Sequence, residues 1–145
     1  MATDINRIDK ITNNRNKSRD PFYSDFFVNF NNHPETGKLV LNKDAEAIKR
    51  ALKNLIYTNK GERFYDPNLG CDLKKILFEN FSEVTTQMIK TYIEDAINTY
   101  EPRVSLIEVV VVPYEEQNLY NIIIVFEMIN QAEPITLTLN LYRVR

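Results

Sequence analysis

Three apolar segments near the end of the chain constrain its fold most. They are "RVSLIEVVVVPY", "LYNIIIVFEMI" and "PITLTLNLYRV", separated by the short polar stretches "YEEQNL" and "NQAEP". Short loops between successive strands indicate an antiparallel meander. The continuous aliphatic runs at 109–112 and 122–126 predict that the first two strands are central and covered on both faces.

The third segment alternates between apolar and polar side chains. Its apolar positions are Ile135, Leu137, Leu139 and Leu141, and its polar positions are Thr136, Thr138, Asn140 and Tyr142. This period predicts one buried and one exposed face. As the last of the three strands, the segment is predicted to lie at a sheet edge, where unpaired backbone groups can accept an added strand. An ordinary amphipathic strand without that role is the alternative.

Two long helices are predicted before the strands. The first is "NKDAEAIKRALKNLIYTNKGER", with Asn42 as its N-cap and Gly61 at its end. The second is "SEVTTQMIKTYIEDAINTY", with Ser82 as its N-cap. A compact loop and a short helical piece near 72–78 join them. The apolar stripes predicted to be buried are Ala45, Ile48, Leu52, Leu55 and Ile56 in the first helix, and Val84, Met88, Ile89, Tyr92, Ile93, Ala96, Ile97 and Tyr100 in the second.

The first 41 residues divide into two parts. Residues 1–21 carry five basic and three acidic side chains and few aliphatics, which predicts a flexible basic arm. A terminus without a role is the alternative. Residues 22–41 contain five aromatic side chains and the turn "HPETGKL", which predicts a short hairpin with strands near 26–30 and 38–41. The predicted fold is therefore α+β: two long helices packed on a three-stranded antiparallel C-terminal meander, with one domain spanning 22–145.

Composition restricts the class of protein. A net charge of −2 over 145 residues does not fit a nucleic-acid-binding protein, although binding by the basic arm is a remote alternative. The start of the chain lacks the apolar core of a secretory signal, and no apolar run approaches the ~20 residues of a membrane span. Cys71 is the only cysteine, so an internal disulfide is impossible and a small buried side chain is predicted there.

Catalytic and metal-binding patterns are not found. His33, the only histidine, is predicted to lie in a turn with no ligand partner at metal-binding spacing. A glycosidase needs two carboxylates across a cleft. The adjacent or neighbouring carboxylates are predicted to be solvated or to lack such a cleft; they are Glu94 with Asp95, Glu115 with Glu116, and Glu101 with Glu108. We therefore predict no catalytic, cofactor or metal site and no enzymatic activity.

The junction between the second helix and the first long strand reads Glu101-Pro102-Arg103. Pro102 disfavours helical geometry at the preceding residue, so the helix is predicted to end there. Two opposite charges at a junction between rigid elements are well placed for a polar contact with a partner. A helix stop with solvated neighbours is the alternative. If Arg103 makes a bidentate, partly desolvated contact with a partner, Arg103→Lys should weaken assembly and leave the stability of the isolated chain nearly unchanged. A large drop in the melting temperature of the isolated chain would instead identify Arg103 as an internal brace.

Three stretches taken together resemble the sheath-initiator family of contractile phage tail baseplates, which also includes a type VI secretion baseplate subunit. They are "HPETGKLVLNKDAEAIKRALKNLIYTNKGERFYDP", "LGCDLKKILFENFS" and "YEPRVSLIEVVV", and the likeness covers about residues 22–128. The stretch "NLGCDL" and the Glu-Pro-Arg helix exit resemble the baseplate proteins of T4-like tailed phages. Leu69 and the pair Ser82-Glu83 depart from the family pattern, but no charged motif residue is lost.

The resemblance implies a structural baseplate wedge protein of the virion, assembled in the host cytoplasm, with six copies around the tail tube. Its implied partners are other wedge subunits, the first-ring sheath protein and the tube or tube-initiator proteins. Glu101, Pro102 and Arg103 would contact the wedge core bundle, and sheath arms would add strands at Thr136, Thr138, Asn140 and Tyr142. Alternatives are a type VI secretion subunit and a peptidoglycan-cleaving lysozyme, which the residues above do not support.

Overall fold

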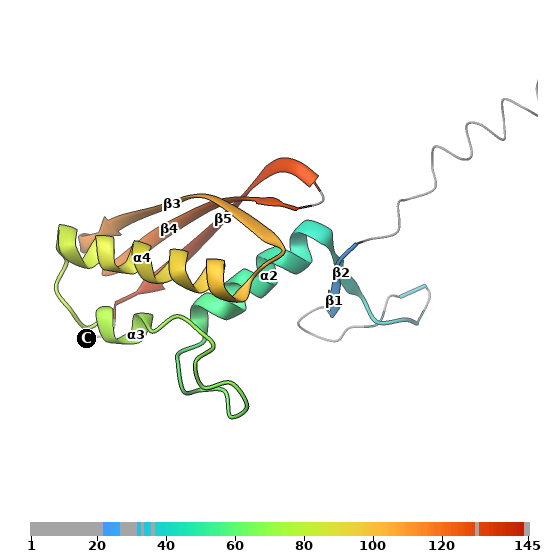
Figure 1. Cartoon of the computed structure of the whole chain (residues 1–145), viewed down its shortest axis with the longest axis horizontal. Coiled ribbons are helices and arrows are strands. Elements are labelled where there is room, and N and C mark those ends of the chain that lie inside the picture. Colours follow the sequence, from blue (N-terminus) through green and yellow to red (C-terminus); the bar gives the residue numbers. More distant parts are fainter. Residues whose placement is uncertain (1–21, 27–31, 33, 36, 130, 144–145) are drawn as a thin grey trace, which may run out of the picture. The chain divides into compact units, whose positions relative to one another are not determined.

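The computed structural model describes residues 22–26, 32, 34–35, 37–129 and 131–143 (Figure 1). The chain divides into two compact units, one reaching to Asp44 and the other spanning Ala45–Arg145. The predicted basic arm, His33 and two of the five N-terminal aromatic side chains lie outside the described residues. The boundary predicted between residues 21 and 22 therefore stays a prediction.

The first unit contains a small hairpin. Strands β1 (Ser24–Phe26) and β2 (Leu41–Lys43) pair antiparallel. Both strands differ from the predicted ranges, and Asn42 lies in β2 instead of capping a helix. Asp44, the first residue of the helix that follows, contacts the hairpin: its Oδ1 accepts the backbone N–H groups of Phe22 (2.8 Å) and Tyr23 (3.2 Å). The carboxylate at the start of the helix therefore binds the start of the hairpin.

The second unit contains the predicted three-stranded meander. Strands β3 (Val104–Tyr114), β4 (Leu119–Met128) and β5 (Gln131–Tyr142) form an antiparallel sheet in the order β3-β4-β5. The 3₁₀ turn η1 (Glu115–Gln117) joins the first pair. The second predicted loop is wrong, because Gln131 already pairs with Met128 and the stretch 131–134 belongs to β5.

Among the described residues, the sheet is covered on one face only, which differs from the prediction that β3 and β4 are covered on both faces. Figure 1 shows helices α2 and α4 on the same side of the sheet. The side chains of Ile122, Ile124 and Phe126 on that face are fully buried. Half-buried aliphatic side chains face the other way; they are Val110, Val112, Ile123 and Val125. Strand β3 is an edge strand that packs beside helix α4. The prediction of a central strand was wrong because a continuous aliphatic run occurs both in central strands and in edge strands beside a helix.

The helices are close to the predicted ranges. Helix α2 (Asp44–Tyr57) ends four residues before Gly61, and α3 (Leu73–Ile76) is the short helical piece. Helix α4 (Glu83–Tyr100) begins at the predicted cap, where the Ser82 hydroxyl accepts the Thr85 N–H at 3.0 Å.

The buried stripe predicted for α4 is narrower than expected. Ile89, Ile93, Ala96 and Ile97 are buried, but Val84 is 70% exposed and Met88 and Tyr92 are also exposed. Tyr100 is only partly buried. In α2, Ala45 is partly exposed and Ala47 is buried instead.

Candidate interaction sites

The Glu101-Pro102-Arg103 turn is held together by an internal ion pair. Helix α4 ends where the Glu101 N–H donates to the Ile97 carbonyl at 2.9 Å. The Arg103 guanidinium then turns back to the Glu101 carboxylate, with Nε donating to Oε1 at 2.5 Å and Nη2 to Oε2 at 2.7 Å. This is the bidentate geometry in which a guanidinium and a carboxylate bind most strongly.

Burial separates the roles of the three turn residues. The Glu101 side chain is 8% exposed and the Arg103 side chain is 38% exposed. A nearly buried carboxylate is costly without a cation, so Arg103 satisfies Glu101 within the chain. Pro102 is exposed. The solvent-exposed surface of the turn therefore consists of Pro102 and the outer part of the Arg103 side chain, and Glu101 fixes the orientation of the guanidinium.

Within the described part of the chain, strand β5 is an edge strand with no neighbour beyond β4. The Arg143 N–H donates to the Asn118 carbonyl at 2.8 Å, in the same register that pairs Tyr142 with Leu119 and Asn140 with Asn121. Antiparallel partners alternate between hydrogen-bonded and non-hydrogen-bonded positions. Counting back from Arg143, the odd-numbered residues from Leu141 to Ile135 bond to β4. The backbone groups of the even-numbered positions 136–142 face away from the sheet, and their side chains are the exposed ones, as predicted.

One position of this edge is already occupied. The Tyr57 hydroxyl, at the end of α2, donates to the Asn140 carbonyl at 3.1 Å. Next to it lies a hollow of about 320 Å³. Its lining comes from the end of α2, from α3 and from the end of β5, and includes Leu77 and Tyr142. The outward backbone groups of Thr136 and Thr138 have no hydrogen-bond partner among the residues that the structure describes.

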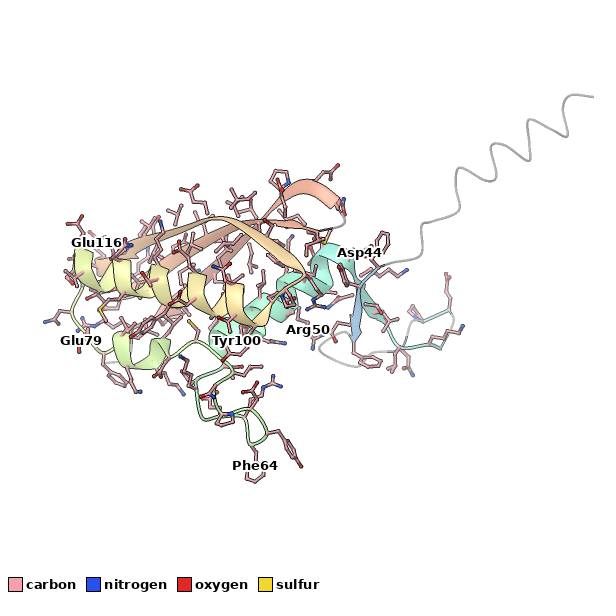
Figure 2. All side chains as sticks on the ribbon, in the orientation of Figure 1. Asp44, Arg50, Phe64, Glu79, Tyr100 and Glu116 are labelled. Carbon is pink, nitrogen blue, oxygen red and sulfur yellow. The ribbon has the colours of Figure 1, made fainter. Side chains whose placement is uncertain are left out.

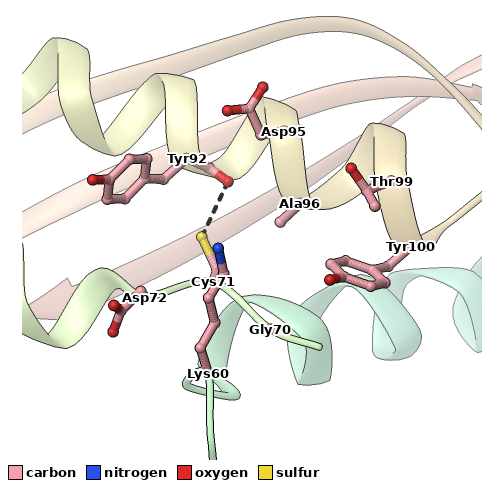
Figure 3. A pocket seen from close by; sticks show the side chains of 9 residues that line it. All are labelled: Lys60, Gly70, Cys71, Asp72, Tyr92, Asp95, Ala96, Thr99 and Tyr100. Atoms are coloured by element: carbon pink, nitrogen blue, oxygen red, sulfur yellow. Dashed lines mark hydrogen bonds between the residues drawn. The ribbon is translucent and has the colours of Figure 1, made fainter. Parts of the chain in front are cut away.

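A second hollow lies between the loop before α3 and helix α4 (Figure 3). It has a volume of about 230 Å³, and Cys71, Asp72, Asp95 and Tyr100 are among its lining residues. Cys71 is buried, as predicted, and its Sγ donates to the Tyr92 carbonyl at 3.3 Å. Burial raises the pKa of the Cys71 thiol to about 12. The sulfur therefore stays protonated at neutral pH, where a thiol is a poor nucleophile.

Residues 37–129 and 131–143, with the described part of the hairpin, contain no group of three or more His, Cys, Asp or Glu side chains placed to hold a metal ion. Within the same ranges, no helix is long and apolar enough to cross a membrane.

The described surface therefore combines an edge strand of the sheet with a rigid, charged turn, and the described residues hold no metal cluster. The sequence profile of the family described as baseplate wedge protein gp25 matches residues 42–133. The baseplate wedge protein gp25 of Enterobacteria phage T4 is 36% identical over 104 residues, which cover 68% of this chain and 79% of that protein. The chain therefore belongs to the gp25 family of contractile-tail baseplate wedge proteins, which confirms the predicted resemblance.

Two solved structures share the fold. A Geobacter sulfurreducens protein provisionally described as a tail lysozyme has a TM-score of 0.68 and 24% identity, covering 73% of this chain and 96% of that chain. A chain of the anti-feeding prophage baseplate has a TM-score of 0.58 and 22% identity, covering 85% of this chain and 86% of that chain. At these identities the matches establish the mixed helix and sheet fold alone.

Proposed function

We propose that this baseplate wedge protein docks on neighbouring wedge subunits through the turn at 101–103 and nucleates the tail sheath by accepting strands at the edge of β5. The observation that carries the proposal is the outward alignment of the β5 backbone at positions 136–142. Backbone hydrogen bonds supply the affinity when a strand is added to such an edge.

The chemistry of the edge supports a partner there. Exposed edges are usually protected by charged side chains or proline, because unpaired strands aggregate. Between Thr136 and Tyr142 the exposed side chains are uncharged. An edge without this protection is a liability unless another chain covers it. The hollow beside Tyr142 would receive side chains of the added strand.

The docking role of the turn rests on its rigidity. Glu101 fixes the Arg103 guanidinium, and the Arg103 carbonyl accepts the Ile129 N–H at 3.2 Å, which ties the turn to the end of β4. A guanidinium held in one orientation loses little freedom when it binds an acidic partner group. We propose that Pro102 and Arg103 make this contact and that Glu101 positions it.

The assembly is proposed to contain six copies, consistent with the six-fold symmetrised baseplate whose chain shares the fold. First-ring sheath subunits would supply the added strands, and tube or tube-initiator proteins would lie inside the ring. Assembly would take place in the host cytoplasm, and no nucleic acid, membrane or cofactor takes part in the proposal.

Strand addition is tested at Thr138, whose N–H faces outward. Proline there removes an edge donor without breaking the β4–β5 ladder, and proline is tolerated on edge strands. We expect Thr138→Pro to fold and to bind wedge subunits, but to abolish sheath polymerisation on assembled baseplates, as counted by negative-stain electron microscopy. The matched variant Thr138→Val keeps the N–H and should polymerise sheath normally. Normal polymerisation on Thr138→Pro would exclude β5 as the acceptor edge.

We also infer that the protein is not a cell-wall hydrolase, although a structural relative carries the lysozyme description. Both oxygens of Glu101 are bound by Arg103, and Glu115 and Glu116 are exposed at the β3–β4 hairpin. Purified protein should leave the turbidity of a peptidoglycan suspension unchanged. Clearing that is lost in Glu101→Gln, with the circular dichroism spectrum retained, would overturn this inference.

A further inference from the structure

The loop between α2 and α3 carries the two most exposed aromatic side chains of the described residues. Phe64 is 93% exposed and Tyr65 is 98% exposed. Their rings pack edge to face, with centroids 5.5 Å apart and planes at 90°. Figure 2 shows Phe64 at the far end of the loop, pointing away from the helices and the sheet. Large aromatic side chains are usually buried, so a paired and fully exposed set requires an explanation.

The loop that carries this aromatic tip (Phe64 and Tyr65) is closed at its base by backbone hydrogen bonds. The Cys71 N–H donates to the Thr58 carbonyl at 2.9 Å, and the Gly61 N–H donates to the Pro67 carbonyl at 2.7 Å. Gly70 allows this closure, because a Cβ there would lie 2.4 Å from the Thr58 carbonyl oxygen. The two segments that form the base of the loop are therefore held together by these bonds.

Side chains hold the loop from outside as well. Glu62 accepts the Asn59 N–H at 3.0 Å and forms a 3.4 Å ion pair with Lys74. The Tyr100 hydroxyl donates to the Asn68 carbonyl at 2.8 Å. This last bond joins the loop to the end of α4, one residue before Glu101. This hydrogen bond therefore ties the loop that carries the tip to the residue that precedes the 101–103 turn.

We propose that the aromatic tip inserts into an apolar pocket on the same wedge subunit that the 101–103 turn contacts. The pocket would have a polar rim facing the Tyr65 hydroxyl and the exposed flanking charges of Arg63 and Asp66. A preformed tip loses little conformational entropy on insertion, and buried aromatic anchors dominate the energetics of protein interfaces. The choice of partner rests on the proposed docking at 101–103; the insertion itself does not.

The size of the tip favours a contact within a larger assembly. Two aromatic side chains bury at most about 500 Å², whereas a stable two-protein complex buries about 800 Å² on each partner. The tip alone is too small to sustain a dimer of this chain, but it fits as one of several contacts with a wedge subunit. The flanking charges are of opposite sign and the net charge is −2, so no basic excess attracts an anionic lipid surface.

The test uses the full chain and the purified wedge subunits of the same phage. The double variant Phe64→Ser/Tyr65→Ser should raise the Kd for these subunits at least about tenfold, as expected for anchor residues. Its melting temperature should stay within about 2 °C of the wild type, because fully exposed side chains contribute little to stability. The conservative double variant Phe64→Leu/Tyr65→Phe should retain most of the binding. Tyr114→Ser, at an exposed aromatic side chain of the β3–β4 hairpin, is the matched control and should bind normally.

Several outcomes would overturn the proposal. They are an unchanged Kd for Phe64→Ser/Tyr65→Ser, loss of self-association instead of wedge binding, and tip-dependent binding to vesicles of phosphatidylcholine and phosphatidylglycerol. The same binding measurements distinguish docking through the 101–103 turn from insertion of the aromatic tip. If Arg103→Lys binds normally while the tip variant fails, the turn is not the docking point and insertion stands. The reverse result leaves the turn as the docking point and excludes insertion.

Discussion

At the scale of single residues, the Glu101–Arg103 ion pair decides how the turn responds to substitution. Glu101 has 8% side-chain exposure, and its two oxygens are both bound by Arg103. The sequence predicted that Arg103→Lys would leave the stability of the isolated chain nearly unchanged if Arg103 bound a partner, and would lower it strongly if Arg103 were an internal brace. The internal pair changes this expectation, because a lysine cannot reproduce the bidentate geometry and leaves the carboxylate under-satisfied.

We therefore expect Arg103→Lys to lower the free energy of unfolding by about 1–2 kcal/mol. This lies below the 3–5 kcal/mol for breaking a fully buried pair, because Arg103 is 38% exposed. Urea unfolding of the isolated chain measures the change. Pro102→Ala, at an exposed position outside the pair, is the control and should cost less than about 0.5 kcal/mol. Equal stabilities of Arg103→Lys and wild type would mean that the pair does not brace the turn in solution.

Gly70 allows a second prediction at residue scale. Its φ of +125° and its close approach to the Thr58 carbonyl both exclude a side chain without rearrangement. Gly70→Ala should lower the free energy of unfolding by about 2–4 kcal/mol. Gly61 separates the two causes, because it has a positive φ but no atom within 4 Å of its Cβ position. Gly61→Ala should cost only about 1 kcal/mol. Similar losses in the two variants would show that close approach does not matter at Gly70.

Cys71 gives the chain a specific dependence on alkaline pH. The pKa of the folded thiol is raised by burial from 9.0 to about 12. The stability that comes from keeping the thiol protonated is complete below pH 9 and is lost as pH rises toward 12, by up to about 1.4 kcal/mol per pH unit.

Cys71→Ser isolates this effect from other titrating groups, because serine can keep the donor to the Tyr92 carbonyl and does not titrate. The difference in unfolding free energy between wild type and variant should be constant from pH 6 to about pH 8.5. Above about pH 9 the wild type should lose stability relative to the variant. A difference that stays flat to about pH 11 would contradict the raised pKa.

At the scale of elements, local sequence patterns predicted which segments form helices and strands better than they predicted which elements pack beside one another. Ser82 was recognisable as a cap because its hydroxyl needs only the N–H three residues later. The alternation at 135–141 predicted the exposed side of β5 for a similar, local reason. The edge position of β3 and the exposure of Val84 were missed, because both depend on which elements lie alongside. The internal pair at 101–103 and the aromatic tip depend on tertiary geometry and had no periodic signal.

Tyr57 tests how far the open edge of β5 extends. Its hydroxyl covers the Asn140 carbonyl, so an added strand beyond position 138 competes with it. Tyr57→Phe should cost about 0.5–1.5 kcal/mol of stability, since one partly exposed hydrogen bond is lost. It should also lengthen the accessible edge, so sheath nucleation should be as fast as or faster than in wild type. Nucleation assayed by light scattering on assembled baseplates measures this, and slower nucleation would mean that the Tyr57 contact is part of the acceptor site.

At the scale of the whole molecule, the hydrophobic core belongs to one of the two units. Every buried apolar side chain of the described residues lies at or after Ala47, in the unit Ala45–Arg145. The hairpin of the first unit exposes about half of Phe22 and Phe26. Burial of apolar surface is the main favourable term in folding, so the stability of the chain should come from the second unit. All three proposed binding elements, the turn, the β5 edge and the aromatic tip, also lie within it.

This distribution predicts that a chain shortened to begin at Asp44 folds by itself. It should unfold in urea in a single transition, with a free energy within about 1 kcal/mol of the full chain, the difference arising from lost contacts at the start of α2. Sheath nucleation should persist, because Thr136 and Thr138 are unchanged. In a matched variant of the shortened chain, Ile93→Ala removes a fully buried side chain. Its free energy of unfolding should fall by about 2–5 kcal/mol, because the substitution leaves a cavity in a packed core. A broad or absent transition in the shortened chain would mean that residues before Asp44 contribute to the core.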